Sequence, residues 1–312
     1  MFMPRLHPQL HCLLPAALFF IVTSAHAQTQ PVNSTQPLPT PVQTSVAQVA
    51  PLNPALPTVF VIGDSTAHNQ ADLGWGDHLA HYFDTTRINV ANRAIAGRSS
   101  RSFIHEGVWD KVLAEMKPGD YMLLQMGHND GGALDGTRPR GTLKGLGEET
   151  KDATLLDGSV ETVHTYGWYM RKYIADTRAK HATPILLSLT IRNIWVDGPD
   201  GKQHIERDMG YDGYIQQLAA GEHVLFVDMA NVEADRLEAA GPEKAALLFP
   251  KDHTHTSAEG AELNAQSVVR ALRLAHSPLD TYLAKDLPPA ITDVSASPTV
   301  PGAAKGSEPA HR

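Results

Sequence analysis

Cysteine is almost missing from the 312-residue chain, because the single Cys12 lies within its first residues. These residues carry Arg5, an apolar run at 13–22 and Ser24-Ala25-His26-Ala27. That order is typical of a secretory signal peptide over residues 1–27, and the run is too short to persist as a membrane anchor. We therefore expect a mature chain without cysteine that is periplasmic or secreted, which excludes disulfides, thiol catalysis and thiolate-bound metals.

Charged residues do not gather into a run of one sign. The formal net charge is −8, and the lack of a basic stretch argues against a nucleic-acid or anionic-membrane surface. Residues 28–57 are rich in Pro, Thr and Gln and nearly free of charge, so we expect a disordered linker. Residues 288–312 are rich in Pro, Ala and Ser and are expected to be a disordered tail. One folded domain, residues 58–287, remains between them.

Short apolar runs alternate with segments of helical spacing throughout this domain. The runs expected to be strands are 59–62, 88–91, 121–126, 184–189 and 223–227. Helices are expected at 75–83, at 108–116, at 160–177 with a cap at Asp157 or Ser159, and after a capping box at 256–259. This alternation predicts the α/β class, with a parallel sheet between two helical layers in a three-layer α/β/α sandwich.

Two connections are longer than is usual in a compact α/β domain. Residues 127–156 contain seven glycines and no apolar period, and residues 190–205 form the second long loop. Both follow expected strands at the sheet edge where open α/β sheets bind ligands. Side chains suited to an anionic or sugar ligand occur in both loops: Arg138, Arg140, Lys144, Arg192 and Trp195.

Ser65 follows the first expected strand directly, after Gly63 and Asp64. A hydroxyl at the carboxyl end of a buried strand lies at that ligand-binding edge. A simple Ser or Asx turn explains this stretch equally well. Because a free hydroxyl is a poor nucleophile near neutral pH, catalysis by Ser65 requires a general base elsewhere in the chain.

His255 is the candidate base because it lies in a polar turn before the last expected helix, three residues after Asp252. In a tight turn this spacing lets the carboxylate reach Nδ1 of the imidazole, while Nε2 faces the serine. Both residues are also ordinary loop and capping residues, and a lone D-x-x-H is common. A metal site is a further alternative, since His253 and His255 form H-x-H beside Asp252, whereas the pair His78 and His81 is expected on a solvated helix face.

Stabilisation of a tetrahedral intermediate requires donors at the place where negative charge develops. Candidates follow three successive strands: the backbone N–H of Ser65, the backbone N–H of Gly97 and the side-chain amide of Asn129. Each alone is an ordinary turn residue. Their joint occurrence, with a base after the fifth strand, favours an oxyanion hole.

These residues resemble the sequence blocks of the GDSL/SGNH hydrolases. The matching strings are Gly63-Asp64-Ser65, Gly97, Gly127-His128-Asn129-Asp130 and Asp252-His253-Thr254-His255, and the resemblance covers about residues 58–277. It implies a triad of Ser65, His255 and Asp252, with Ser65, Gly97 and Asn129 as the oxyanion hole. It also implies a flavodoxin-like sheet of five parallel strands. The stretch after Gly63 lacks the second glycine of the G-x-S-x-G motif of α/β-hydrolases.

A finer resemblance is to the rhamnogalacturonan acetylesterases, which are secreted enzymes that remove acetyl groups from pectic polysaccharide. It is carried by Gly63-Asp64-Ser65-Thr66, Gly97-Arg98-Ser99-Ser100-Arg101, the stretch 140–149 and Asp252-His253-Thr254-His255-Thr256. Such a polymer carries carboxylates, which arginine can bind through two hydrogen bonds. Candidate substrate-binding residues are therefore Arg98, Arg140, Arg192, Trp195 and His253, although single loop arginines are more often simply solvated.

The sequence therefore predicts a monomeric serine acetylesterase that acts on rhamnogalacturonan without a cofactor or metal. A deacetylase of xylan or of another acetylated glycan uses the same residues. Two alternatives from other classes remain at this point. One is a carbohydrate-binding module without activity, and the other is a metal-dependent hydrolase that uses His253 and His255.

Overall fold

The computed structural model describes residues 51–292. The expected signal peptide, most of the expected linker and the expected tail from residue 293 onward lie outside the described residues. Within residues 51–292, no helix has both the length and the apolar character needed to cross a membrane.

The central sheet has five parallel strands in the order β2-β1-β3-β6-β9. These strands are β1 (Thr58–Ile62), β2 (Asn89–Asn92), β3 (Tyr121–Leu124), β6 (Thr183–Leu187) and β9 (Leu225–Val227). Each of the five runs expected to be a strand contributes one of them. The order is that of flavodoxin-like folds, in which ligands bind where the strand order reverses between β1 and β3. The predicted fold class is confirmed.

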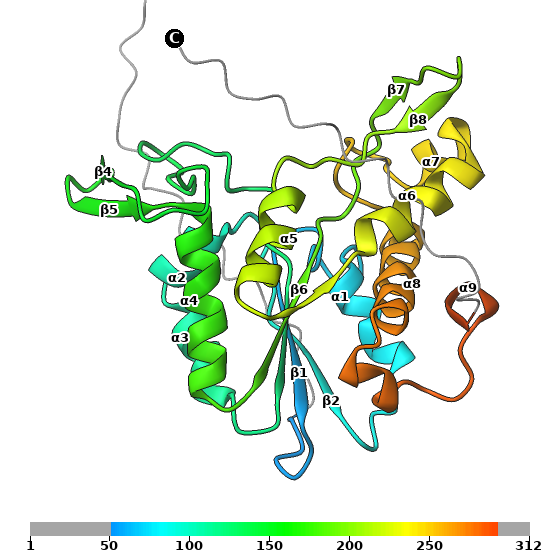
Figure 1. The fold of residues 1–312 in the computed structure, drawn as a ribbon, viewed down its shortest axis with the longest axis horizontal. Coiled ribbons are helices and arrows are strands. Elements are labelled where there is room, and N and C mark those ends of the chain that lie inside the picture. Colours follow the sequence, from blue (N-terminus) through cyan, green and yellow to red (C-terminus); the bar gives the residue numbers. More distant parts are fainter. Residues whose placement is uncertain (1–50, 293–312) are drawn as a thin grey trace, which may run out of the picture. The chain divides into compact units, whose positions relative to one another are not determined.

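Successive side chains of β1 point to opposite faces of the sheet, and both faces are buried. Val59 and Val61 belong to one apolar cluster with α1, α6 and α8, whereas Phe60 and Ile62 belong to another with α2 to α5. The helices therefore form one layer on each side of the sheet (Figure 1).

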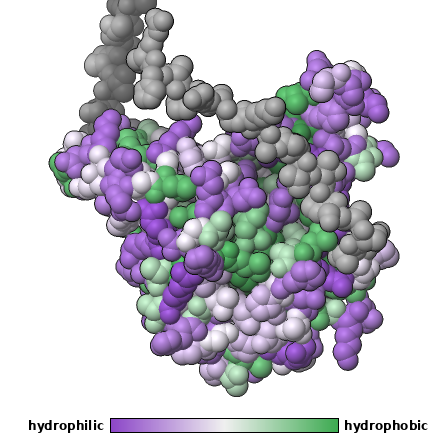
Figure 2. All heavy atoms as spheres, viewed as in Figure 1, coloured by the Kyte–Doolittle hydropathy of each residue, from purple (hydrophilic) through white to green (hydrophobic). Residues whose placement is uncertain are grey.

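The helical elements have the following bounds in chain order. They are α1 (Trp75–His78), η1 (Leu79–Tyr82), α2 (Ser100–His105), α3 (Val108–Glu115), α4 (Tyr166–Ala179), α5 (Asp212–Gly221), α6 (Met229–Ala240), α7 (Pro242–Leu247), α8 (Ala258–Leu274), η2 (Pro278–Tyr282) and α9 (Pro289–Thr292). Hydrophilic residues cover most of the face seen in Figure 2, and hydrophobic residues gather near its centre.

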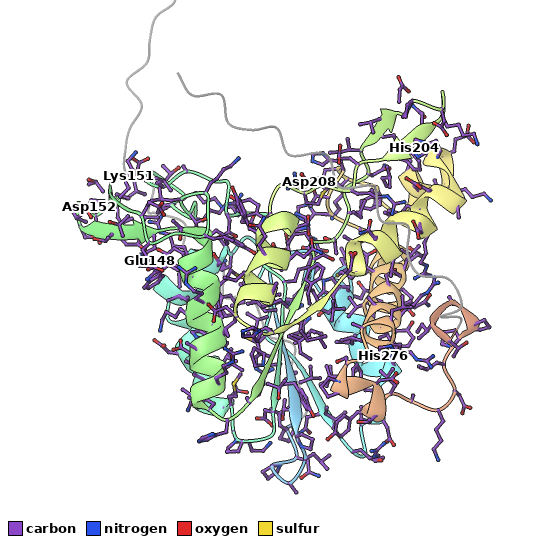
Figure 3. All side chains as sticks on the ribbon, in the orientation of Figure 1. Glu148, Lys151, Asp152, His204, Asp208 and His276 are labelled. Carbon is purple, nitrogen blue, oxygen red and sulfur yellow. The ribbon has the colours of Figure 1, made fainter. Side chains whose placement is uncertain are left out.

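Both long connections contain an antiparallel hairpin. The first is formed by β4 (Thr150–Thr154) and β5 (Val160–His164), and the second by β7 (Trp195–Asp197) and β8 (Gln203–Ile205). The two hairpins lie on either side of the carboxyl end of the sheet (Figure 1). Figure 3 labels Lys151 and Asp152 on the first hairpin and His204 on the second.

The helix expected at 160–177 begins later, at Tyr166, and the caps expected at Asp157 or Ser159 are wrong. Residues 160–164 pair with β4, and Thr165 caps the helix by accepting a hydrogen bond from the Trp168 N–H. Gly158, at φ 82°, allows the turn between the two strands. The last helix is capped by Ser257 rather than Thr256, since the Ser257 hydroxyl accepts from the Gly260 N–H.

The described domain extends beyond the expected boundaries at both ends. Asn53 exchanges hydrogen bonds with the Asn89 side chain, and Leu52 packs against the core. Ile291 of α9 is fully buried. Residues 51–57 and 288–292 are therefore part of the folded unit.

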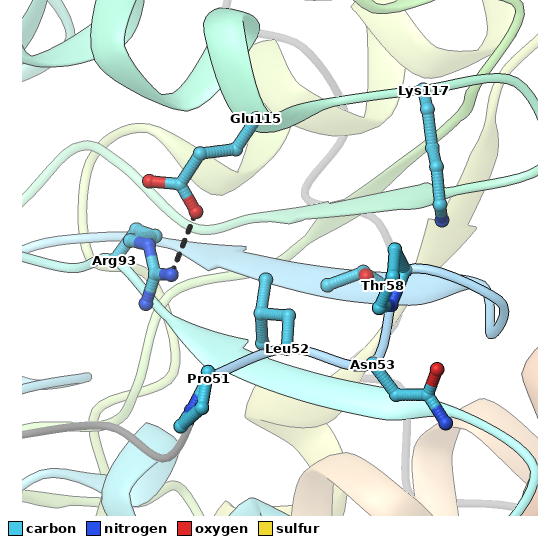
Figure 4. Close-up of a pocket in the computed structure, with 8 residues that line it drawn as sticks. Pro51, Leu52, Asn53, Thr58, Arg93, Glu115 and Lys117 are labelled. Carbon is cyan, nitrogen blue, oxygen red and sulfur yellow. Dashed lines mark hydrogen bonds and ion pairs between the residues drawn. The ribbon is translucent and has the colours of Figure 1, made fainter.

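Residues 51–54 also border an open hollow of about 380 Å³ (Figure 4). The remainder of its lining is Thr58, Arg93, Glu115 and Lys117. Arg93 and Glu115 form an ion pair at 2.7 Å across it. None of the candidate catalytic or oxyanion residues lines this hollow.

Arg101 of α2 fixes the first long connection to the domain. Its guanidinium is fully buried and forms two hydrogen bonds with the Glu161 carboxylate, at 2.9 and 2.6 Å. Its remaining nitrogen donates to the carbonyls of Leu134 and Gly141. One side chain thus holds the β4–β5 hairpin and the loop before it against α2.

We expect Arg101→Met to lower the free energy of unfolding by about 3 kcal/mol or more, because it leaves the Glu161 carboxylate without its buried partner. Urea denaturation followed by circular dichroism measures this loss. The matched control is Arg93→Met, whose partner Glu115 is 40% exposed and which should cost less than about 1 kcal/mol. Equal losses in the two variants would contradict the anchoring role of Arg101.

Candidate active site

Ser65, His255 and Asp252 form a continuous chain of hydrogen bonds. Oγ of Ser65 lies 2.9 Å from Nε2 of His255, and Nδ1 of His255 lies 2.7 Å from Oδ2 of Asp252. Ser65 follows β1, and the other two residues lie between α7 and α8. The structure therefore brings the predicted nucleophile, base and carboxylate together in the order that acyl transfer by a serine requires.

The protonation states follow from the partners. Desolvation alone would raise the pKa of the Asp252 carboxyl, but hydrogen bonds from the His255 ring and from the backbone N–H groups of His255 and Thr254 lower it to about 2. The ionised carboxylate only accepts, so Nδ1 of a neutral His255 carries the proton. Nε2 then has a lone pair for the Ser65 hydroxyl proton.

The loop that carries His255 is held from two sides. Asp252 Oδ1 accepts from the N–H groups of Thr254 and His255, which tightens the turn. The Asn193 N–H donates to the His253 carbonyl, and the Thr256 hydroxyl donates to the Leu73 carbonyl. These bonds fix the histidine loop to the second long connection and to the segment that follows Ser65.

A buried polar network fixes the end of β1 beneath Ser65. Thr66 donates from its N–H and hydroxyl to Oδ1 of Asp64, and its hydroxyl also lies 2.8 Å from Oε1 of Gln125. The same Gln125 oxygen accepts from the indole N–H of Trp75. Asp64 and Gln125 are fully buried, so this network positions the serine without reaching solvent.

The three expected oxyanion donors follow β1, β2 and β3, which are neighbours in the sheet. Within residues 51–292, neither the Ser65 nor the Gly97 N–H has an acceptor, so both are available to a ligand. The Asn129 amide donates one proton to the Arg98 carbonyl at 2.8 Å, and its second N–H proton remains. Gly97 adopts φ 79°, a conformation that favours glycine.

Asp130, next to Asn129, holds the residue at the end of the Gly97 loop, Ser100, by hydrogen bonds. Its buried carboxylate accepts from the Ser100 N–H and the Ser100 hydroxyl. Burial raises the pKa of Asp130 to about 7, although the Ser100 bonds oppose the shift. The carboxyl thus connects the start of α2, which follows the Gly97 loop, to the segment after β3.

His128 is a neutral imidazole beside the catalytic histidine. Its pKa is lowered to about 4, chiefly by burial and also by the nearby Arg192 and His255, although the charge of Asp64 opposes the shift. Arg192 approaches Nδ1 at 3.5 Å and can only donate, so Nε2 carries the proton and donates to the Thr190 hydroxyl at 2.9 Å. His128 therefore adds no positive charge next to His255 at neutral pH.

The loop arginines differ in whether an acid neutralises them. Arg98 pairs with Glu106 at 2.8 Å, so its guanidinium is already engaged. Arg138 and Arg140 have no carboxylate partner within residues 51–292. Arg140 donates to the Gly97 carbonyl at 3.1 Å, and its pKa is lowered by burial and then by the charge of Arg138, although it remains protonated.

Arg98, Arg138 and Arg140 line a hollow of about 230 Å³ that reaches Gly97. Lys144 and Arg192 are two further cations without a carboxylate partner in the described part of the chain. Trp195 is half-buried and packs against the cluster that contains Phe249. The His253 side chain is exposed.

The structure does not place His253 in a group of metal ligands. Among residues 51–292, the one group of three such side chains with ligand atoms close together is His78, His81 and Glu262. Because His255 is engaged by Asp252 and Ser65, the H-x-H hypothesis at His253 is not supported.

Sequence reasoning gave no role to Gln125, His128 or Asp130. His128 and Asp130 flank Asn129, so their position beside an expected oxyanion donor was the available signal. Gln125 is a single polar residue in the apolar run 121–126. That pattern indicates a buried amide, but its partners Thr66 and Trp75 lie on other segments that only the fold brings together.

Comparisons with known proteins point to one family. The model of the GDSL-like lipase/acylhydrolase family matches residues 61–263. A rhamnogalacturonan acetylesterase of Emericella nidulans is 33% identical over 215 residues, which cover 69% of this chain and 84% of the relative. The probable rhamnogalacturonan acetylesterase YesY of Bacillus subtilis is 28% identical, with 73% of this chain and 98% of the relative covered.

Among solved structures, the crystal structure of Bacillus subtilis YxiM matches with a TM-score of 0.54 and 28% identity. The match covers 70% of this chain and 56% of YxiM, so the chain spans little more than half of that relative.

The pKa of Asp130 predicts a pH-dependent effect of Asp130→Asn on stability. The folded protein keeps the proton up to about pH 7, whereas an unfolded aspartate loses it near about pH 3.9. The wild type therefore loses stability between these two values, by up to about 1.4 kcal/mol for each pH unit between them. The neutral amide of the variant has no such loss, so the free energy of unfolding of the variant should rise relative to wild type as pH rises from about 4 to 7.

Urea denaturation at several pH values across this window measures the difference. Other buried acids, such as Glu233, contribute equally to both proteins and cancel. Asp152→Asn, on the exposed β4–β5 hairpin (Figure 3), is the control and should follow the wild-type pH dependence. A constant difference between Asp130→Asn and wild type would rule out the raised pKa.

Proposed function

The chain belongs to the GDSL-like lipase/acylhydrolase family and is a carboxylic ester hydrolase, and from this premise we propose that it is a secreted serine acetylesterase that acts on rhamnogalacturonan. The observation that carries the mechanism is the hydrogen-bonded chain from Ser65 through His255 to Asp252. The observation that carries the substrate is the set of cations near Gly97 that have no carboxylate partner within residues 51–292.

The reaction begins when Oγ of Ser65 attacks the acetyl carbonyl carbon while Nε2 of His255 takes the hydroxyl proton. The ionised Asp252 stabilises the imidazolium that forms. The tetrahedral oxyanion is bound by the N–H groups of Ser65 and Gly97 and by the Asn129 amide. Collapse breaks the bond to the sugar oxygen, which leaves with the proton from His255.

The acetyl group is then bonded to Ser65. A water molecule gives a proton to His255 as its oxygen attacks the acetyl carbonyl, and collapse releases acetate and restores the Ser65 hydroxyl. Every proton in the cycle passes through Nε2 of His255. The proposed reaction uses only these side chains, the backbone N–H groups of Ser65 and Gly97, and water.

Arg138, Arg140 and Arg192 support a polyanionic substrate. They lie in the two long loops and have no carboxylate partner within residues 51–292, although the chain as a whole carries a net charge of −8. Galacturonate carboxylates match these guanidinium groups in charge and geometry. The names of the relatives from Emericella nidulans and Bacillus subtilis point to the same polymer. Xylan, which has far fewer carboxylates, is the second candidate.

Secretion is the third part of the proposal. It rests on the signal-like first 27 residues and on the lack of cysteine after residue 12. A polymeric cell-wall substrate is also found outside the cytosol. N-terminal sequencing of the protein recovered from periplasm and medium tests the cleavage after Ala27.

Ser65→Ala is expected to reduce acetate release from p-nitrophenyl acetate by at least about a thousandfold, because it removes the nucleophile. Asn129→Ala should reduce kcat by about a hundredfold through the loss of one oxyanion donor. Initial rates from purified variants measure both effects, and circular dichroism verifies their folding.

His253→Ala is the control for the first experiment, since the exposed His253 ring is next to the triad but outside the hydrogen-bonded chain. Its activity on p-nitrophenyl acetate should stay within about threefold of wild type. Undiminished activity of a folded Ser65→Ala would refute the serine mechanism.

For the substrate, we expect faster acetate release from acetylated rhamnogalacturonan than from acetylated xylan. Arg138→Gln should lower kcat/KM on rhamnogalacturonan about fivefold, as expected for the loss of one partly exposed ion pair, and leave p-nitrophenyl acetate hydrolysis unchanged. Arg98→Gln is the matched control, because Glu106 already neutralises Arg98 and a smaller loss is expected. A preference for xylan, or equal effects of the two variants, would reject the galacturonate assignment.

A further inference from the structure

His78, His81 and Glu262 come together on the outer side of the helical layer formed by α1 and α8. His78 ends α1, His81 lies in η1 and Glu262 lies in the first half of α8. One potential ligand atom from each lies within 4.8 Å of the other two. None of these residues belongs to the catalytic chain or the oxyanion hole. We propose that the three side chains form a binding site for a divalent transition metal, with zinc as the best match.

The hydrogen bonds of His78 determine which of its nitrogens is available. Nε2 lies 2.8 Å from the carbonyl oxygen of Asp72, which can only accept, so Nε2 carries a proton. Nδ1 lies 2.8 Å from Oε2 of Glu262. With the proton on Nε2, Nδ1 has the lone pair that a metal ligand needs. A metal ion beside this pair would be bound by Nδ1 and by Oε2 of Glu262.

The arrangement around His78 is the one found for histidine ligands in metalloproteins. A ligating imidazole usually donates its other N–H to a carbonyl or carboxylate, which fixes its tautomer and orientation. The Asp72 carbonyl fills that role here. The side chain of His78 is only 14% exposed, so the ring is already held in place.

Glu262 is oriented in the same way. The Tyr82 hydroxyl donates to Oε1, and the Gln266 amide donates to the same oxygen at 3.2 Å. These neutral donors engage one carboxylate oxygen and leave Oε2 directed at His78. An ionised carboxylate with one committed oxygen is suited to bind a metal through the other.

His81 supplies the third ligand from the solvent side. It is exposed, and its ring nitrogens have no hydrogen-bond partner among residues 51–292. It lies three residues after His78, so both rings emerge on the same side of the chain, with centroids 6.2 Å apart. Two imidazoles and one carboxylate are a donor set that zinc binds well, and the exposed side leaves a fourth position for water.

The site would connect the two segments that carry the catalytic groups. α1 follows the Ser65 loop and is bonded to it through the Trp75 N–H and the Thr66 carbonyl. α8 begins three residues after His255. A metal that joins η1 to α8 would stabilise this half of the fold, whereas the ester chemistry at Ser65 needs no metal.

The test uses the purified chain, stripped of metal by a chelator, and zinc ion alone as the probe. Isothermal titration should show one zinc per chain. The melting temperature should rise by about 5 °C when free zinc exceeds its dissociation constant about a hundredfold. His81→Asn and Glu262→Gln should each weaken zinc affinity at least about tenfold. Glu262→Gln keeps the shape that Tyr82 contacts.

His276→Asn is the matched control, since His276 is an exposed histidine beyond the end of α8 (Figure 3), and its zinc affinity should equal that of wild type. Equal affinity in wild type and His81→Asn would place the zinc on other histidines and overturn the proposal. Absence of binding to wild type would also overturn it. Ser65→Ala should bind zinc like wild type, so this result is independent of the esterase proposal.

Discussion

The hydrogen bond between Oγ of Ser65 and Nε2 of His255 joins residues that are 190 positions apart in the chain. Its length of 2.9 Å depends on the placement of two separate segments. The Gln125 network fixes the end of β1 from below, and the Thr256–Leu73 and Asn193–His253 bonds fix the histidine loop from the side. Catalytic alignment is therefore a property of the whole carboxyl edge of the sheet.

Solvent exposure determines which side chains at this edge of the sheet are charged. Asp252 lies at the surface among N–H donors, so its carboxyl stays ionised, with a pKa of about 2. Asp130 is buried beside the Gly97 loop, and its pKa of about 7 reflects desolvation. His128 is kept neutral by the same effect. Asp252 is therefore the ionised carboxylate that contacts the catalytic imidazole.

The first long connection carries arginines that lie beside the expected oxyanion hole. Arg101 and Glu161 hold the first of them against α2, so its position does not depend on a large apolar core of its own. The rigid attachment brings Arg138 and Arg140 beside Gly97, where an ester is expected to bind. Positive charge is thus concentrated next to the oxyanion donors of an otherwise acidic protein.

The sequence alone determined the fold class and the members of the candidate triad. Strands such as 59–62 are short, apolar runs between helical periods, and this local pattern is enough to predict a buried parallel sheet. Ser65, His255 and Asp252 were identifiable from turn chemistry and family resemblance. The hairpin at 150–164 was missed because the partner of Val160 lies on another segment, and strand pairing overrode the helical spacing.

Only the tertiary structure decided which polar residues have a bonded partner and which are buried. These two properties then determine the charge that each residue carries or leaves unpaired. Arg98 and Arg138 look alike in sequence, but within residues 51–292 Arg98 pairs with an acid, Glu106, and Arg138 does not. Asp130 and Asp252 are both loop aspartates, yet burial raises the pKa of the first and hydrogen bonds lower the pKa of the second. Pairing and desolvation depend on neighbours brought together from distant parts of the chain, and a linear pattern does not contain that information.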